Sequence, residues 1–172
     1  MPAAQQRNDE LAQLLSADLL SSDDRNVLIE SYYSGADMSF TSTVVVPINT
    51  TRLNVANDIF SLSNNIITVA QAGIYMITGY LRVARSTSIG DNACFFWIDQ
   101  DPAMGSFVEV PASRGGIHVP NGGTASAEVS VRLRALAGYR YRMRMERDWG
   151  SDTLRVLHEG AKLSIVRLFG LR

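Results

Sequence analysis

The stretch that most constrains the fold is residues 72–83, AGIYMITGYLRV, which contain no proline and no charged residue before Arg82. A β-strand places successive side chains on opposite faces, so its pattern is read with a period of two. One face then carries Tyr75, Ile77, Leu81 and Val83, and the other carries Ile74, Met76, Thr78 and Tyr80. Both faces are largely apolar. The pattern therefore predicts a central strand with one face in a core and the other face against a second surface.

Length and composition fit one globular domain with or without an appendage. The chain has 172 residues, of which 46% are hydrophobic and 19% charged. A net charge of −1 gives no overall field that would attract nucleic acid or an anionic membrane. No run approaches the ~20 apolar residues of a membrane helix, and no secretory signal pattern is present. We expect a soluble protein made in a cytoplasm, with neither nucleic acid nor membrane as partner.

The first part of the chain, residues 1–33, is predicted to form an N-terminal arm. Asn8 or Asp9 is a suitable N-cap for a short amphipathic helix. Its apolar stripe consists of Leu11, Leu14, Leu15 and Leu19. A helix of this length is marginal alone in water, so the stripe needs a surface: its own domain, another subunit or a foreign partner. Residues 26–33 alternate as a strand would, yet Ser22 could cap a second helix; an extended arm is the favoured interpretation.

The remainder, residues 34–172, is predicted to be all β. Strands are expected at 38–47, 52–55, 59–62, 66–69, 73–83, 93–99, 125–136, 139–147, 154–157 and 161–169. Asn-rich and Gly-rich turns separate them, and residues 100–124 form a long irregular segment with three prolines. Short strands at this spacing are typical of a two-sheet sandwich or a barrel.

Two of these strands alternate clearly. In the first, Val129, Val131 and Leu133 are expected to face inward, with Ser130, Arg132 and Arg134 outward. In the second, one face has Tyr139, Tyr141, Met143 and Met145, and the other has Arg140, Arg142, Arg144 and Glu146. The arginine face is the strongest constellation in the sequence. Buried arginines need carboxylate partners, and a solvated β face with no role is the alternative.

The pattern resembles a known superfamily, the jelly-roll trimers typified by tumour necrosis factor and the globular heads of complement. Residues 60–83 carry the likeness, with a short strand, an Asn turn and then Gly-Ile-Tyr leading into a long strand. Residues 125–145 add paired alternating strands around a glycine turn, and 161–170 resemble the closing strand. The resemblance implies a two-sheet jelly roll that forms a homotrimer.

Within that superfamily the chain is most similar to capsid decoration (cement) and head-fibre proteins of tailed bacteriophages. Complement-type members have a collagen stalk, and vertebrate members usually have Gly-Asp before the strand that here begins at Tyr139; this chain has neither. A short arm precedes the head instead. The resemblance implies a virion protein on the capsid exterior, made in the host cytoplasm, with the major capsid protein as partner and the arm as anchor.

The family arrangement also implies where subunits meet. It would place the strands beginning at Gly73 and Tyr139 in one inner sheet around the threefold axis, with the strand from Ala125 in the opposite sheet. The expected trimer interface then comprises Ile74, Met76, Tyr80, Arg140, Arg142, Arg144 and Glu146. The arginines would pair there with carboxylates of a neighbouring subunit.

Other chemistries find little support in the sequence. His118 and His158 are forty residues apart, and no Gly-x-Ser-x-Gly elbow accompanies them, so no catalytic residue is assigned. Residues 99–101 and 148–152 hold carboxylates but lack a full calcium-loop spacing, so no metal or cofactor is expected. Cys94 lies in an apolar run and is predicted to be a buried structural thiol. Nucleic acid is disfavoured because no aromatic residue alternates onto the arginine face.

Three functions follow from this reading. The first is a homotrimeric decoration protein anchored by its arm. The second is a fibre or spike head that binds a host receptor or glycan through residues 100–124. The third is a cytoplasmic enzyme or lectin-like protein, which a metal or substrate between His118 and an acidic loop would favour. An assembly role, without catalysis, is the preferred prediction.

Overall fold

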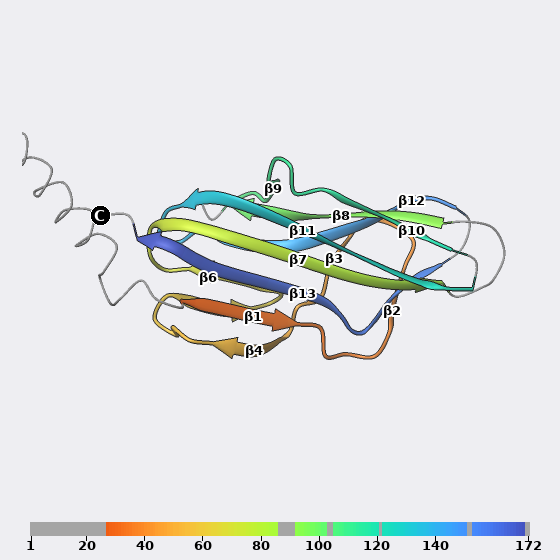
Figure 1. The fold of residues 1–172 in the computed structure, drawn as a ribbon, viewed down its shortest axis with the longest axis horizontal. Helices are drawn as coiled ribbons and strands as arrows, with labels where there is room; N and C mark the ends of the chain where they lie inside the picture. The colour runs from red at the N-terminus through yellow and green to blue at the C-terminus, as the bar shows by residue number, and fades with distance from the viewer. Residues whose placement is uncertain (1–26, 86–91, 103–104, 121, 151–152, 171–172) are drawn as a thin grey trace, which may run out of the picture.

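The computed structural model describes residues 27–85, 92–102, 105–120, 122–150 and 153–170, and these form an all-β sandwich of two antiparallel sheets (Figure 1). The predicted jelly roll is confirmed. The leucine stripe predicted at Leu11, Leu14, Leu15 and Leu19 lies outside the described residues.

Sheet A has the strand order β11-β7-β13-β1-β4, with β2 paired to β13. Its strands are β1 (Leu28–Tyr32), β2 (Met38–Phe40), β4 (Thr50–Asn54), β7 (Gly73–Arg85), β11 (Thr124–Ala135) and β13 (Leu154–Gly170). The predicted central strand is β7, which pairs with β11 on one side and β13 on the other.

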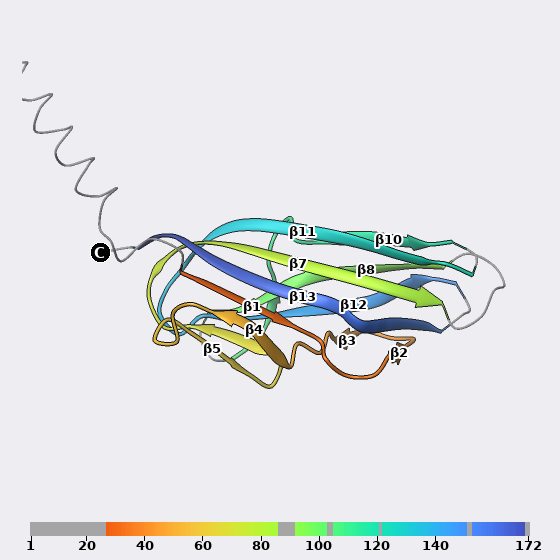
Figure 2. The same cartoon turned by 60° about the horizontal axis from the view of Figure 1, so that its bottom comes forward.

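Sheet B has the strand order β10-β8-β12-β6-β5, with β3 paired to β12 and β9 paired to β8. Its strands are β3 (Val44–Val45), β5 (Phe60–Ser63), β6 (Ile66–Val69), β8 (Asn92–Asp101), β9 (Val108–Glu109), β10 (Gly115–Val119) and β12 (Arg140–Trp149). The sheets stack face to face, and β4 and β5 lie along the same edge of the sandwich (Figure 2).

The core lies between the two sheets and follows the predicted alternation. On β7, Tyr75, Ile77, Leu81 and Val83 are fully buried. On β12, the inward residues Tyr141, Met143 and Met145 are fully buried as well. The two strands meet across the sandwich at Gly79 of β7 and Met143 of β12. A Cβ atom added at Gly79 would lie only 3.3 Å from the Met143 sulfur. The alternation thus assigned the core face of both strands correctly.

The N-terminal boundary differs from the prediction. Residues 28–32 are not part of an arm but form β1, which lies between β13 and β4 in sheet A. Val27, Ile29 and Ser31 alternate into the core, with exposures of 6%, 0% and 0%. The sandwich therefore begins before Ser34, and the strand alternative for residues 26–33 was the right one.

The segment expected to be irregular, residues 100–124, contains the strand β10. The first residue of β10 is Gly115, and there is no space for a larger side chain at this position. A Cβ on it would lie 2.6 Å from Val129 Cγ1 and 2.9 Å from Phe96 Cε1. Glycine lets β10 pass close over these side chains and pair with β8.

The two strands predicted at the end of the chain are one strand, β13, interrupted by a bulge. Val156 pairs with Val83 and Ala161 with Leu81, so residues 157–160 lie opposite Arg82 alone. Glu159 takes a positive φ of 54° within the bulge. Conversely, the single strand predicted at 38–47 is two strands, β2 in sheet A and β3 in sheet B.

Cys94 confirms its prediction as a buried thiol, with 0% exposure in the core. Burial raises the pKa of Cys94 from its ordinary 9.0 to about 12. The unfolded chain would lose the thiol proton near pH 9, and the folded chain only near pH about 12. The stability that the protonated Cys94 contributes is therefore complete below pH about 9 and is lost as the pH rises to about 12.

We therefore predict that a maleimide at pH 8 labels the native protein at least about 100-fold more slowly than the urea-unfolded chain, because the thiolate is the reactive form and is absent from the core. Mass spectrometry of timed samples measures the rate. Rapid stoichiometric labelling of the native protein would contradict the burial of Cys94.

Candidate functional site

The outer face of sheet B carries the predicted arginines. Strands β8 and β12 are paired so that Arg140 lies opposite Asp101 and Arg142 opposite Asp99. Arg142 donates two hydrogen bonds of 3.2 Å from Nε and Nη2 to Asp99 Oδ2. Arg140 binds Asp101 Oδ2 in the same manner, through Nε at 3.0 Å and through Nη2. Both carboxylates are buried, with side-chain exposures of 2% and 0%.

Aromatic rings complete this arrangement. Trp97 donates from Nε1 to Asp99 Oδ1 at 2.7 Å, so Asp99 serves two partners at once. The Arg142 guanidinium stacks 3.9 Å from the centroid of Phe107, and that of Arg144 lies 5.4 Å from Trp97. Cation–π contacts of this kind contribute about 0.5–2 kcal/mol each, depending on their exposure.

Arg114 of the loop before β10 extends the network. It contacts Glu109 at 2.6 Å and Glu146 at 2.8 Å, and it stacks 4.2 Å from the Trp97 centroid. Hydrogen bonding to Arg114 holds the pKa of Glu109 below its ordinary value, and the same bonds raise the pKa of Arg114. Thr43 donates to the second oxygen of Glu146 at 3.1 Å.

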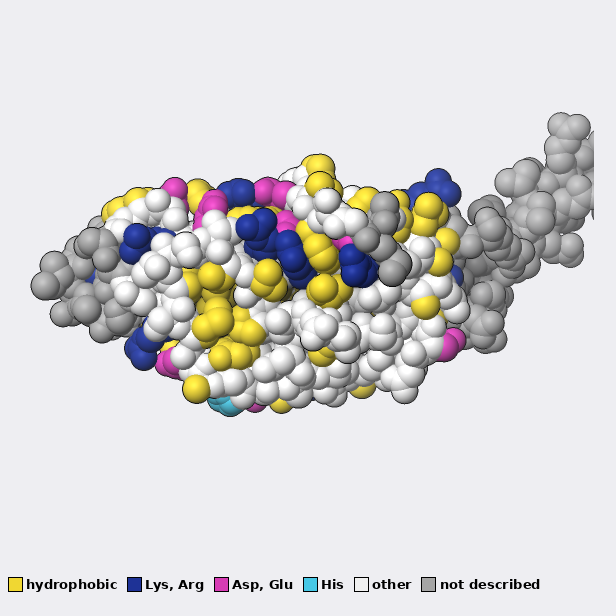
Figure 3. Space-filling view, turned by 180° about the vertical axis from the view of Figure 1, so that it is seen from behind, with side chains coloured by type: hydrophobic (Ala, Val, Ile, Leu, Met, Phe, Trp, Pro, Cys, Tyr) yellow, Lys and Arg dark blue, Asp and Glu magenta, His cyan; other side chains and the backbone are white. Residues whose placement is uncertain are grey.

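We call these groups the arginine network: Arg114, Arg140, Arg142, Arg144, Asp99, Asp101, Glu109, Glu146, Trp97 and Phe107. Figure 3 shows its basic side chains in a row along the sheet B side of the molecule, with acidic and hydrophobic side chains between them. The predicted partners were wrong in one respect, because the arginines find their carboxylates within the same chain. The Asp99 and Asp101 carboxylates also accept from the Trp97 side chain and from the Gly105 backbone N–H, respectively.

The aromatic content of this face was also misjudged. The prediction assumed that no aromatic residue shares it, yet Trp97 and Phe107 do. Trp97 is only 4% exposed, and arginine guanidiniums lie over both rings. The rings therefore hold the network together and present little open surface for stacking.

The outer face of sheet A is different. Five of its apolar side chains form one patch near the start of β7 and the end of β13. Register places Met76 beside Val166, and Val166 beside Leu28, while Ile74 lies beside Phe169. Met76 is 39% exposed and Phe169 45%, and the other three are half-buried. We call Ile74, Met76, Val166, Leu28 and Phe169 the apolar patch.

A bulge in β13 contributes to this patch. Arg167 pairs with Tyr75 and Phe169 with Ile74, so the intervening residue is extra. The extra residue turns Phe169 to the outer face, whereas strict alternation would place it with the inward set. Arg132 flanks the patch, with its guanidinium 5.8 Å from the Phe169 ring. An exposed apolar patch of this kind is typical of a contact surface.

Beside the patch lies a shallow hollow of about 350 Å³ on the same face. Its lining is charged and aromatic: Tyr32, Arg52, Tyr80, Glu128, Glu159 and Lys162. Arg52 lies 3.6 Å from Glu30 and 3.9 Å from Glu159, and its guanidinium stacks 4.8 Å from the Tyr32 centroid. Lys162 lies 3.5 Å from Glu30.

The two halves of the predicted interface are thus on opposite sides of the sandwich. Ile74, Met76 and Tyr80 face outward from sheet A, whereas Arg140, Arg142, Arg144 and Glu146 face outward from sheet B. The strand from Thr124 was expected in the opposite sheet to β7, but it is the direct neighbour of β7. Alternation identifies the outward face of each strand; it does not identify the strand beside it.

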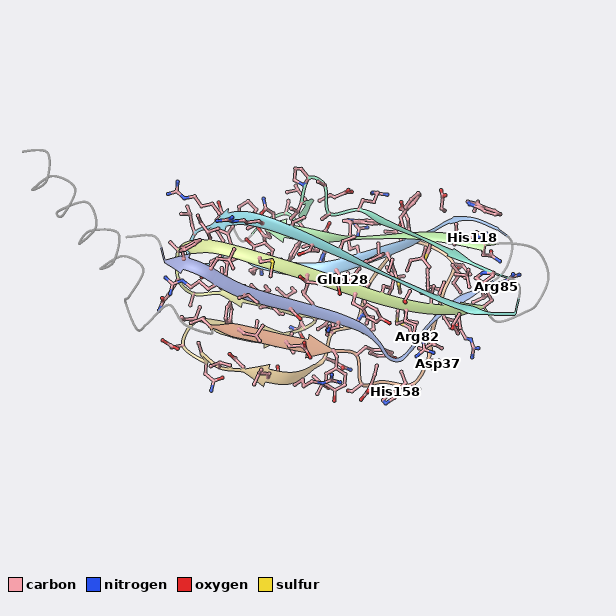
Figure 4. All side chains as sticks on the ribbon, viewed as in Figure 1. Asp37, Arg82, Arg85, His118, Glu128 and His158 are labelled. Atoms are coloured by element: carbon pink, nitrogen blue, oxygen red, sulfur yellow. The ribbon has the colours of Figure 1, made fainter. Side chains whose placement is uncertain are left out.

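The two histidines do not meet. Figure 4 shows His118 near one end of sheet B and His158 near the β13 bulge. His158 Nδ1 contacts the carbonyl oxygen of Gly35 at 2.9 Å, and its backbone N–H donates to Asp37 at 3.0 Å. His118 stacks on Trp149, with 6.0 Å between the ring centroids and 26° between the planes.

The described residues contain no group of three or more His, Cys, Asp or Glu side chains placed to hold a metal ion. Within the same ranges, no helix is long and apolar enough to cross a membrane.

No family model and no curated protein matches the sequence. Solved structures do match the fold. Eiger TNF from S. frugiperda aligns with a TM-score of 0.62 and 12% identity, over 85% of this chain and 94% of the other. Murine APRIL at pH 8.0 aligns with a TM-score of 0.59 and 12% identity, over 82% of this chain and 98% of the other. The fold is therefore the TNF-like jelly roll.

We predict that Asp99→Ala lowers the free energy of unfolding by about 2–4 kcal/mol, because it leaves the buried Trp97 N–H and the Arg142 guanidinium without their acceptor. Urea unfolding followed by tryptophan fluorescence measures this. The control is Glu109→Ala, which removes an exposed ion pair and should cost at most about 1 kcal/mol. Equal losses in the two variants would show that the buried carboxylate has no special role.

Proposed function

We propose that the protein is a homotrimeric structural protein that assembles through the outer face of sheet A. The observation that carries this is the apolar patch, in which Met76 and Phe169 are 39% and 45% exposed in the single chain. Burying such side chains stabilises a contact by about 25 cal/mol per Å² of apolar surface. The TNF-like fold supports the proposal because trimers are characteristic of this type of jelly roll.

The sheet arrangement limits which predicted contacts belong to that interface. Ile74, Met76 and Tyr80 stay in it because they face outward from sheet A. The arginine network lies on sheet B and its charges are already paired, so we leave it outside the interface. The outer face of sheet A exposes the apolar patch, whereas the arginines of sheet B are paired with carboxylates of the same chain.

For the setting of this trimer we propose the outer surface of a bacteriophage head, with the major capsid protein as partner. The support is the likeness of the sequence to decoration and head-fibre proteins and the leucine stripe near the N-terminus. An amphipathic stripe needs an apolar surface to bind, and three copies on one trimer would raise its affinity by multivalency. The protein would then act on the capsid exterior, as a stabilising cement without catalysis.

The trimer is tested by mass in solution. We expect about three times the 18.9 kDa of the chain in sedimentation equilibrium at micromolar concentration. Met76→Glu should raise the trimer dissociation constant at least about tenfold, because a carboxylate would be buried among apolar side chains. The control Val108→Glu changes a more exposed valine, on β9 of sheet B, and should leave the trimer intact. A monomeric wild-type protein would overturn the proposal.

The capsid role has its own experiment. Capsids purified without the protein are mixed with the full chain and sedimented. Leu14→Asp with Leu15→Asp should abolish co-sedimentation, since charges on the stripe prevent apolar contact. Leu136→Asp, an exposed leucine of the sandwich, is the control. If the double variant binds at full strength, the anchoring role is wrong while the trimer stands.

One observation favours a second candidate function, the recognition head. Trp149 is 48% exposed and stacks on His118. A bulge between Arg147 and Trp149 turns this ring to the outer face of sheet B. His118 lies at the end of the sandwich opposite the start of β1 and the end of β13 (Figure 4). An exposed aromatic ring there could stack on a sugar ring of a host glycan, and loss of glycan-array binding in Trp149→Ala, with Val108→Ala unaffected, would support this function.

A further inference from the structure

We propose that Glu128 of one subunit forms an ion pair with Arg52 of the next subunit in the trimer. This inference rests on the trimer proposed above. It names the contact that sets the register of the subunits around the threefold axis.

Glu128 belongs to a transverse row of sheet A that ends on β4 at Thr50, opposite Tyr32, and the side chain of Arg52 reaches this end of the row. Glu128 lies opposite Tyr80, and Tyr80 lies opposite Lys162. Lys162 in turn lies opposite Tyr32, whose ring is covered by the Arg52 guanidinium. The row thus crosses the whole sheet, from β11 at one edge to β4 at the other, and it forms the floor of the hollow.

Within one chain the two side chains are too far apart to pair. Four strand spacings of about 4.8 Å separate β11 from β4, or roughly 19 Å between the backbones. Among the described residues, Glu128 has no ion-pair partner, although it is exposed on the outer face. Arg52 is 53% exposed and holds its two carboxylates only loosely, at 3.6 and 3.9 Å. Each edge of the row therefore carries one exposed charge, and the two charges are opposite.

Threefold symmetry brings these edges together. A cyclic trimer uses a heterologous interface, in which one edge of a subunit meets the other edge of the next. Rotation about the axis leaves the height along the axis unchanged. The sandwich is elongated along its strands (Figure 1), so with the strands running along the axis each transverse row of one subunit meets the same row of its neighbour. Glu128 at the β11 edge then meets Arg52 at the β4 edge.

The charges farther along these edges fit the same pairing. Beyond Glu128, the β11 edge continues with Arg132 and Arg134, both exposed on the outer face. On the opposite edge, the turn after β4 carries the exposed Asp58. Along the β11 edge a negative charge (Glu128) is followed by positive charges. Along the β4 edge a positive charge (Arg52) is followed by a negative one (Asp58). The β11 edge of one subunit is therefore complementary in charge to the β4 edge of the next subunit in this register.

Charge reversal tests the pair in the full-length chain. Glu128→Arg should raise the trimer dissociation constant at least about tenfold at low salt, because the new arginine would lie opposite Arg52 of the neighbouring subunit and repel it. Arg52→Glu should do the same. Their combination, which restores opposite charges, should recover most of the wild-type affinity. Since the Debye length falls to about 3 Å at 1 M salt, the effect of Glu128→Arg should shrink there.

Two controls separate the possible failures. Val108→Arg introduces an arginine on sheet B instead and should not change the dissociation constant. Glu128→Gln, a mild exposed change, should weaken the trimer less than the reversal does. If the wild-type chain is a monomer, the proposed trimer fails, and this inference fails with it. If the wild-type chain is a trimer but the double reversal is no tighter than either single reversal, the trimer stands and the Glu128–Arg52 pair is wrong.

Discussion

The structure depends on β7, whose pairing with both β11 and β13 builds the centre of sheet A. Twelve consecutive residues of β7 match β11 without a break, so one long strand fixes the register of its neighbour. The alternation of β7 then separates its side chains completely. Tyr75, Ile77 and Leu81 fill the core at 0% exposure, while Met76 and Tyr80 face outward. A slip of one residue would exchange the two sets, so the buried face also specifies which residues form the outer surface.

The two outer faces of the sandwich differ in the kind of side chain that they expose. On sheet B, Asp99 and Asp101 are buried beneath arginines that remain 22–34% exposed, so each carboxylate keeps a partner and each guanidinium keeps some water. The charges of this face are thus paired within the chain. On sheet A, the apolar patch has no such cover. The contrast supports the proposal that subunits meet at the outer face of sheet A, because a subunit contact gains most where water is removed from apolar atoms.

Much of the fold could be predicted from local pattern, and the errors share one cause. Alternation gave the inward residues of β7, β11 and β12, and the Asn64–Asn65 turn has the positive φ values of 51° and 64° that such a turn needs. Alternation could not show that β11 is the neighbour of β7, because strand pairing depends on distant residues. It also failed at extra residues. The bulge at 157–160 made β13 look like two strands, and Gly115 concealed β10 because its role is steric and comes from Phe96 and Val129.

The outer face of sheet A was half-predicted for the same reason. Ile74, Met76 and Tyr80 were correctly predicted to share one face of their strand, because alternation within that strand is enough to show it. Phe169 was missed because a bulge reverses its face, and Glu128 because nothing in its own strand shows what lies opposite it. The outer face of sheet A combines both kinds of residue. Its apolar patch is non-directional and can supply affinity in many registers, whereas a single pair of opposite charges in one transverse row favours one register. A trimer that uses this face therefore needs the patch for strength and the charged row for geometry, and neither can replace the other.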